Sequence, residues 1–242
     1  MFLAAAVLFV PAGAAPQTLD EILARHLAAR GGREALAAVK TVLMLGSATA
    51  GPGRTAIVRR EIARPGRIRT EFVFQGTTGV YAWDGSAGWR VSPLDGRPEP
   101  EPLPDEEAAV AAEQADIEGP LVDWKAKGHR VELAGRDPLP GGPTHRLQLT
   151  LKSGATRQVW LDAATGLVVR TLAMRTLRGR EVALETDFGD YRQTSGVAFA
   201  RSIETGVPGR PRRLRIVVES VEVNVPLDPD RFQMPALKRD SS

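Results

Sequence analysis

Three histidines, His26, His129 and His145, are the side chains of this 242-residue chain best suited to acid-base or metal chemistry. Their spacing matches neither HExxH nor HxxEH, the patterns that place two imidazoles on one zinc ion. His26 falls on the apolar stripe of an expected helix, where a histidine is usually a packed side chain. His145 begins an expected strand in the inward phase, and no recognisable nucleophile accompanies it. A hydrolase centred on His145 is therefore the third of three functional hypotheses.

Other catalytic and cofactor chemistry has no sequence signature here. The chain contains no cysteine, which excludes disulfides, thiolate metal sites and a cysteine nucleophile. It has no GxSxG, P-loop or GxGxxG motif. The carboxylate pairs Asp187/Asp190 and Asp228/Asp230 lie in expected turns, where solvated or capping roles are the usual ones. We therefore expect no enzyme activity, no metal and no cofactor.

The four tryptophans, Trp83, Trp89, Trp124 and Trp160, are a more informative set. Ordinary core packing explains them, and so does an apolar ligand site, because indole offers a large apolar face with a single donor. Ligand pockets are mostly apolar and contain few polar groups. Both interpretations stay open on this observation alone.

The charge balance argues against a nucleic-acid partner. The chain has 32 basic and 29 acidic residues, for a net charge of +3. The densest basic stretches, residues 59–69 and 210–215, alternate with apolar residues, as strand faces do, and no nucleic-acid-binding module is present. Outward arginines could still meet an anionic lipid surface, so transient contact with a membrane or a membrane protein stays open.

The amino terminus predicts export. Residues 3–10 form an uncharged apolar run, followed by Pro11 and the small-residue triplet Ala12-Gly13-Ala14, as in a secretory signal with cleavage after Ala14. The run is too short to span a bilayer, which needs about 20 apolar residues. No Lys or Arg precedes it, and a buried N-terminal helix is the alternative. We expect a signal peptide at 1–14, a single periplasmic domain at 15–242, and a monomer.

Helical signals come first along the mature chain. Thr18 and Glu21 form a capping box, and the apolar residues that follow have helical spacing up to Gly31-Gly32, which should end the helix. Residues 33–40 suit a second short helix. A further helical interlude is predicted over 105–127, with Asp105 as its cap and a break at Gly119-Pro120.

The rest of the chain has the two-residue period of strands. In the third strand Ile68, Thr70, Phe72 and Phe74 share one face, which is typical of a sheet with one buried and one wet side. Residues 98–104 alternate Pro with other residues and predict an extended loop. A phase change predicts a β-bulge near Val218 to Ser220. The predicted strands are 41–50, 54–64, 66–75, 78–84, 87–92, 129–135, 144–152, 155–162, 166–174, 180–190, 197–204 and 211–223.

These elements predict an α+β fold. About 11 sequential strands without βαβ alternation favour a large curved antiparallel sheet that forms a half-open β-barrel. The amphipathic segments at 18–30 and 105–127 are the only candidates to cover its apolar concave face. A barrel of that size, covered by a helical lid, has room for a ligand.

This order of elements resembles a known family. The resemblance rests on four segments, residues 81–89 (YAWDGSAGW), 160–167 (WLDAATGL), 187–191 (DFGDY) and 227–232 (LDPDRF). Together they resemble the periplasmic outer-membrane lipoprotein-sorting proteins of the LolA/LolB-like superfamily, over roughly residues 18–235. The resemblance implies an incomplete barrel closed by helices, which binds acyl chains or lipoproteins. The lack of cysteine argues against a LolB-like anchored lipoprotein.

The leading hypothesis is therefore a non-enzymatic periplasmic carrier whose partner is a lipidated protein or a lipid. The alternative is an envelope sensor or protein-interaction module with the same fold and a collapsed interior. The predicted ligand-binding residues are the inward apolar positions of the strands and lid: Phe72, Phe74, Trp83, Trp89, Val110, Ile117, Trp124, Leu147, Leu149 and Trp160.

Overall fold

The computed structural model describes residues 17–177, 180–210 and 214–236. Within these ranges thirteen strands form one antiparallel sheet, in the order β6-β5-β4-β3-β2-β1-β13-β12-β11-β10-β9-β8-β7. The strands are β1 Thr41–Thr49, β2 Thr55–Ala63, β3 Arg67–Phe74, β4 Thr77–Trp83, β5 Gly88–Ser92, β6 Arg97–Pro102, β7 Arg130–Leu139, β8 Gly142–Thr150, β9 Thr156–Asp162, β10 Val168–Leu177, β11 Arg180–Thr194, β12 Val197–Gly206 and β13 Leu214–Val223. The helices are α1 Leu19–Ala29, α2 Gly32–Ala38 and α3 Asp105–Gln114, with 3₁₀ turns η1 Pro93–Asp95 and η2 Pro229–Phe232.

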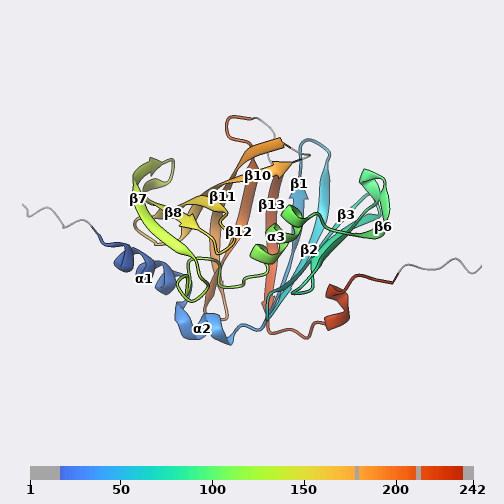
Figure 1. Cartoon of the computed structure of the whole chain (residues 1–242), viewed down its shortest axis with the longest axis horizontal. Coiled ribbons are helices and arrows are strands. Elements are labelled where there is room, and N and C mark those ends of the chain that lie inside the picture. The colour runs from blue at the N-terminus through green and yellow to red at the C-terminus, as the bar shows by residue number, and fades with distance from the viewer. Residues whose placement is uncertain (1–16, 178–179, 211–213, 237–242) are drawn as a thin grey trace, which may run out of the picture.

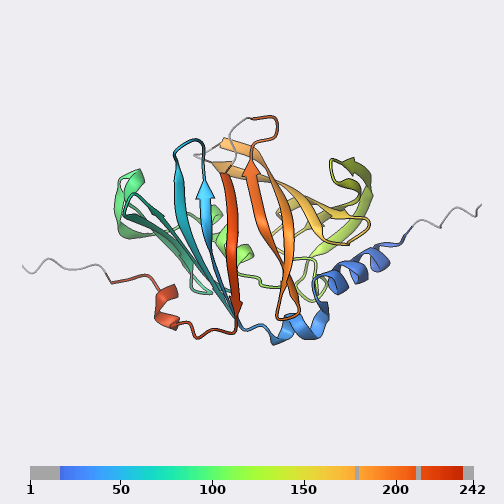
Figure 2. The ribbon, with the colours of Figure 1, turned by 180° about the vertical axis from the view of Figure 1, so that it is seen from behind.

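The sheet curls into an open half-barrel (Figure 1). Helix α3 and the segment after it lie on the concave side, while α1 and α2 run along one end of the sheet. The opposite view shows the convex faces of β1, β13 and β12, which none of the described helices covers (Figure 2). The expected half-open barrel with a helical lid is therefore confirmed.

The alternation of side chains sets which residues face the concave side. Ile62 of β2 pairs with Ile68 of β3, which in turn pairs with Trp83 of β4, so the three lie on one face. Ile62 and Ile68 are buried there, as the two-residue period predicts.

Local sequence signals fix the helix ends. The Thr18 hydroxyl accepts from the Glu21 N–H, and the Glu21 carboxylate accepts from the Thr18 N–H at 2.8 Å, so the predicted capping box is present. Gly31 has a φ of 115°, and a Cβ there would lie 2.0 Å from the carbonyl oxygen of Gly196. Only glycine fits this close backbone approach, and the predicted end of the helix is confirmed.

The predicted β-bulge is also present. Leu45 and Gly46 of β1 are consecutive, but they pair with Ser220 and Val218 of β13, which leaves Glu219 as the extra residue. A Cβ on Gly46 would lie 2.0 Å from the carbonyl oxygen of Val217. The bulge and the glycine thus bring the two central strands unusually close together.

Three expectations need correction. The helix predicted over 105–127 ends at Gln114, and residues 120–127 form turns, since Gly119 and Asp123 both have positive φ. The N-terminal cap is Pro104 rather than Asp105. The proline-rich segment expected as a loop contains the strand β6, whose position at the sheet edge leaves one side without strand partners, as proline requires.

The buried apolar side chains on the concave face form two clusters. The central cluster comprises Leu36, Val39, Val42, Ile62, Ile68, Ala115, Ile117, Val122, Val197, Phe199, Val218 and Val221. The edge cluster comprises Ile22, Leu121, Val131, Leu147, Leu149, Leu151, Val159 and Leu161. The predicted signal peptide, residues 1–14, lies outside the described residues. None of the helices in the described ranges has the length and apolar character to cross a bilayer.

Candidate functional site

The candidate site is a cavity of about 180 Å³ on the concave face, beside the central cluster. Strands β1 and β2 form one wall, β11 and β12 form the other, and the segment after α3 closes one side. Most of the lining is apolar. The lining residues are Arg30, Val42, Met44, Arg60, Ile62, Asp116, Ile117, Phe188, Tyr191, Ala198, Phe199, Ala200 and Ile203.

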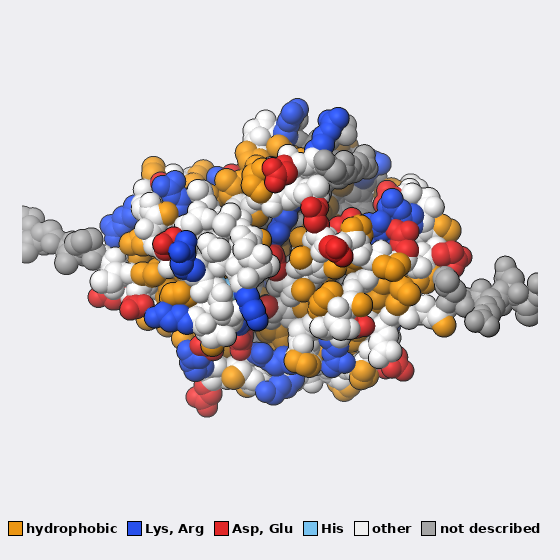
Figure 3. Space-filling view, viewed as in Figure 1, with side chains coloured by type: hydrophobic (Ala, Val, Ile, Leu, Met, Phe, Trp, Pro, Cys, Tyr) orange, Lys and Arg blue, Asp and Glu red, His pale blue; other side chains and the backbone are white. Residues whose placement is uncertain are grey.

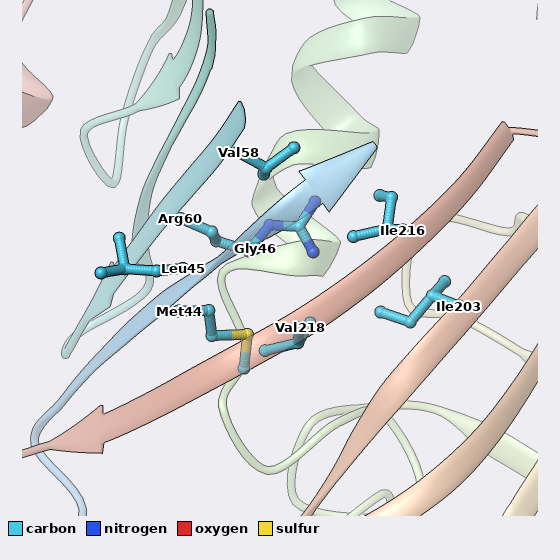
Figure 4. Close-up of a pocket in the computed structure, with 8 residues that line it drawn as sticks. All are labelled: Met44, Leu45, Gly46, Val58, Arg60, Ile203, Ile216 and Val218. Carbon is cyan, nitrogen blue, oxygen red and sulfur yellow. The ribbon is translucent and has the colours of Figure 1, made fainter. Parts of the chain in front are cut away.

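A smaller hollow of about 10 Å³ adjoins this cavity and shares Met44, Arg60 and Ile203 with it (Figure 4). Gly46 lies in its wall. The position that a Cβ on Gly46 would take is occupied by the carbonyl group of Val217, so the backbone of β1 itself forms part of this wall.

One end of the cavity is polar, and its charged groups make hydrogen bonds, although Arg30 Nε has no partner among the described residues. The Arg30 guanidinium donates to the carbonyl oxygens of Ile117 and Glu118, both at 3.2 Å. The Asp116 carboxylate accepts from Lys127 Nζ at 2.6 Å. Burial lowers the pKa of Arg30, while Tyr191, Asp116 and Glu118 oppose that shift. Arg30 thus fastens the segment after α3 to the end of α1, while the bond between Asp116 and Lys127 holds that segment together.

Tyr191 adds a hydroxyl that is also engaged. Its Oη donates to the carbonyl oxygen of Val168 at 2.8 Å, and burial raises the pKa of the phenol to about 12. The hydroxyl therefore stays protonated across the physiological range. Its role is to anchor β11 to β10 rather than to exchange protons.

Arg60 differs from these polar groups. It lies on β2 opposite Met44, within the apolar wall, and its Nε donates to Thr70 Oγ1 at 3.2 Å. Removal from water lowers the pKa of its guanidinium. Among the described residues, no carboxylate lies within ion-pair distance of it.

Helix α3 spans the open side of the sheet. Near its start, Glu107 accepts from Arg90 of β5 at 2.8 Å. Near its end, Glu113 is paired with Arg175 of β10 at 2.9 Å and with Arg157 of β9. Charged side chains thus tie the helix to both halves of the sheet. Figure 3, drawn from the same side, shows acidic, basic and apolar side chains interspersed over this face.

Some predicted ligand-binding residues lie near the cavity. Ile117 lines it. Phe72, Phe74 and Trp83 lie on the concave face of β3 and β4, beside the cavity but outside its lining, and the rings of Phe72 and Tyr81 meet edge-on at 6.5 Å. Val110 is half-buried on α3, the helix that covers these strands.

Other predicted residues lie in a closed part of the molecule. Leu147 and Leu149 have no exposed surface and belong to the edge cluster. Trp124 packs against that cluster from the segment after α3. The structure therefore places Leu147 and Leu149 in closed packing and the half-buried Trp124 beside them, and none of the three lines the cavity.

Trp89 and Trp160 point to the opposite face of the sheet. Trp89 pairs with Ala82, out of phase with Trp83, and its Nε1 donates to the carbonyl oxygen of Phe232 at 2.7 Å. Trp160 pairs with Arg146, and its Nε1 donates to Asp137 at 2.8 Å. These two tryptophans, which were predicted to line one ligand site together with Trp83, therefore do not lie on the same face of the sheet as Trp83.

The histidines are dispersed. His26 is buried, its Nδ1 lies 2.9 Å from the carbonyl oxygen of Gly166, and burial lowers its pKa to about 4. His145 is buried, and neither ring nitrogen has a hydrogen-bond partner among the described residues. His129 Nδ1 accepts from the Lys152 N–H at 3.0 Å. Across the described ranges, no group of three potential ligands is arranged for a metal.

Sequence reasoning missed most of the cavity wall. Val42 and Met44 follow the inward phase of the first strand, and Phe188, Phe199 and Ile203 come from strands whose phase was not assigned. One signal was available: in β2 the inward series Ala56, Val58, Arg60, Ile62 places a charge among apolar residues. A cation in the buried phase marks a position that packing alone does not explain.

No protein-family model and no curated protein matches this sequence. Solved structures do match in fold. An outer membrane lipoprotein-sorting protein domain from Vibrio parahaemolyticus aligns with a TM-score of 0.58 at 14% identity, over 88% of this chain and 94% of that one. A DUF1329 family protein from Desulfovibrio piger aligns at 0.60 and 13%, over 89% and 97%. A LolA superfamily protein from Nitrosomonas europaea aligns at 0.57 and 11%, over 90% and 98%. The fold implied by the family resemblance is confirmed.

Proposed function

We propose that this protein is a periplasmic carrier that holds an acyl chain of a lipid or lipoprotein in the cavity on its concave face. The observation that carries the proposal is a space of about 180 Å³ lined mainly by Val42, Met44, Ile62, Phe199 and Ile203. An apolar space of this kind is unfavourable to leave filled with water and favourable to fill with hydrocarbon, at about 0.8 kcal/mol per buried methylene.

The lid fits a carrier. Helix α3 has no buried residue of its own and is tied to the sheet by Glu107 and Glu113. Partly exposed ion pairs contribute little stability and are readily exchanged for water. We infer that α3 moves aside to admit a chain, and that Phe72, Phe74, Trp83 and Val110 then extend the binding surface.

The cellular setting rests on two supports. The apolar run before Ala14 has the form of an export signal. One structure of the same fold is named for outer membrane lipoprotein sorting. A role in trafficking lipids or lipoproteins through the periplasm follows from both.

The test is native mass spectrometry of the purified full chain, followed by titration of delipidated protein with a fluorescent fatty acid. Bound lipid and saturable binding are expected. Ile203→Trp should weaken binding tenfold or more, because indole fills the cavity. Ile57→Trp is the control, since Ile57 is 65% exposed on the other face of β2.

Two outcomes would contradict the proposal. Delipidated wild-type protein that binds no amphiphile would rule out a carrier and would leave the sensor or interaction module, which a pull-down from envelope extracts then examines. Equal affinity in the Ile203→Trp and Ile57→Trp variants would show that lipid binds elsewhere.

A further inference from the structure

Arg60 is a cation placed where the sheet otherwise presents hydrocarbon. Its neighbours on the concave face are Met44 across the strand pair, and Val58 and Ile62 along its own strand. Its side chain lines both the cavity and the smaller hollow. Figure 4 shows it lying over β1 near Gly46.

Three other arginines of the concave side have acidic partners, whereas Arg30 at the end of the cavity donates to two carbonyl oxygens. Arg90 is paired with Glu101 and Glu107, and Arg157 and Arg175 share Glu113. Arg60 makes one hydrogen bond, from its Nε to the Thr70 hydroxyl, and no carboxylate in the described part of the chain lies within reach of it. A guanidinium has five N–H donors, so most of its hydrogen-bonding capacity is uncommitted.

Such an arrangement is costly unless something compensates for it. Arg60 is half-buried, and a cation partly removed from water without a charged partner loses hydration, which the lowered pKa of Arg60 reflects. Folding alone would be served better by an apolar residue of similar size, as replacements of buried charges show in other proteins. The cost is offset if the partner arrives with the ligand.

We infer that Arg60 binds the anionic head group of a single-chain amphiphile whose acyl chain occupies the cavity. This rests on the proposed function and specifies its ligand. The guanidinium fork matches a carboxylate or a phosphate with two parallel hydrogen bonds, and in an apolar wall such charge-assisted bonds are strong. The head group then lies inside and is shielded from water.

The dimensions favour one chain over two. A water molecule needs roughly 10–15 Å³ of space measured in the same way, so 180 Å³ corresponds to about a dozen waters. That space takes an oxyanion and part of one chain. The remainder of the chain would follow the concave face beneath α3.

The experiment is calorimetric titration of delipidated full-length protein with four twelve-carbon ligands below their micellar concentrations. These are dodecanoate, dodecyl phosphate, monododecanoylglycerol and dodecyltrimethylammonium. The wild-type protein should bind the two anions about 10- to 100-fold more tightly than the neutral ligand, and the cation most weakly. The ratio between dodecanoate and dodecyl phosphate shows which anionic head the site prefers.

The variant Arg60→Met should abolish the preference, so that the ratio of anionic to neutral affinity falls to about one. Arg54→Met is the matched control, because it removes the same charge from an exposed hairpin position and should keep the wild-type ratio. Circular dichroism confirms that each variant is folded. The head-group ranking of the wild-type protein needs no variant and tests the inference even if Arg60→Met does not fold.

The experiment distinguishes a failure of the proposed function from a failure of the inference about Arg60. If none of the four ligands binds, the proposed function is wrong, and the inference about Arg60 falls with it. If all four bind equally to wild-type protein, or if Arg60→Met keeps the anionic preference, lipid binding stands and the assignment of Arg60 is overturned.

Discussion

The two halves of the concave face are built from the same alternating strands, yet one is closed and the other is hollow. Across β7, β8 and β9, Leu147, Leu149 and Leu161 have no exposed surface. They are covered by Ile22 of α1 and by Leu121. Across β1, β2, β11 and β12, residues of the same kind surround a cavity of about 180 Å³.

The difference lies in what covers the sheet. Helix α1 presents Leu19, Ile22 and Leu23 to the strands, so apolar side chains interdigitate and exclude water. Over the hollow half, α3 has no buried side chain and is held mainly by charged ones. An apolar sheet face therefore becomes packed core or the wall of a cavity according to the segment that covers it.

The largest expected effect tests this contrast directly. Leu149→Ala should lower the free energy of unfolding by about 3 kcal/mol, because a fully packed side chain is lost and a void is created. Met44→Ala should cost about 1 kcal/mol, since Met44 is only partly buried and already faces the cavity. Urea denaturation measures both. Equal losses would mean that the two halves are packed alike.

The burial of His26 beside the closed half should also make the stability of the protein depend on pH. The pKa of buried His26 is about 4, against an ordinary value of 6.5. Between these values the unfolded chain binds a proton that the folded chain refuses, so stability falls as the pH drops from about 6.5 to 4. We expect this to contribute about 3 kcal/mol, at about 1.4 kcal/mol for each pKa unit.

His26→Gln isolates that contribution, because glutamine has no proton to gain while its amide can still donate to Gly166. The variant should lose less stability than wild type between pH 7 and pH 4, measured by denaturant titration at each pH. His129 and His145 have lowered pKa values too, so a smaller slope will remain. Parallel curves for the two proteins would disprove the burial of a neutral His26.

The fold was largely predictable because its signals are local. The capping box at Thr18, the turn at Gly31 and the bulge beside Ser220 each depend on a few neighbouring residues. The extent of the lid was not predictable in the same way. Residues 120–127 have an apolar pattern that suits a helix, but tertiary packing of Leu121 and Trp124 holds them in turns.

The candidate site was harder to predict because it depends on which strands curve together. Trp89 and Trp160 were predicted as ligand-binding residues because of their residue type, whereas the strand register puts both on the convex face of the sheet. Leu147 and Leu149 do face inward, but nothing in their own strand shows that α1 covers them. Arg60, a cation in an apolar phase, was marked by its own sequence neighbourhood.

The smallest expected effect concerns the ties that hold α3 across the hollow half. Glu113→Gln should cost about 1 kcal/mol of stability, because Arg157 and Arg175 lose a shared carboxylate in a partly exposed setting. Amide exchange over 105–114 should accelerate, while exchange in α1 should not change. Glu99→Gln is the control, as Glu99 is exposed and belongs to no ion pair among the described residues.

This comparison separates a lid from a structural helix. If α3 were part of the core, its loosening would propagate into β3 and β4, and exchange there would rise together with that of the helix. If it is a cover held by charge, the strands stay protected and only the helix opens. A rise in exchange across the whole sheet in Glu113→Gln would therefore refute a separately mobile α3, and with it the route by which a chain enters the cavity.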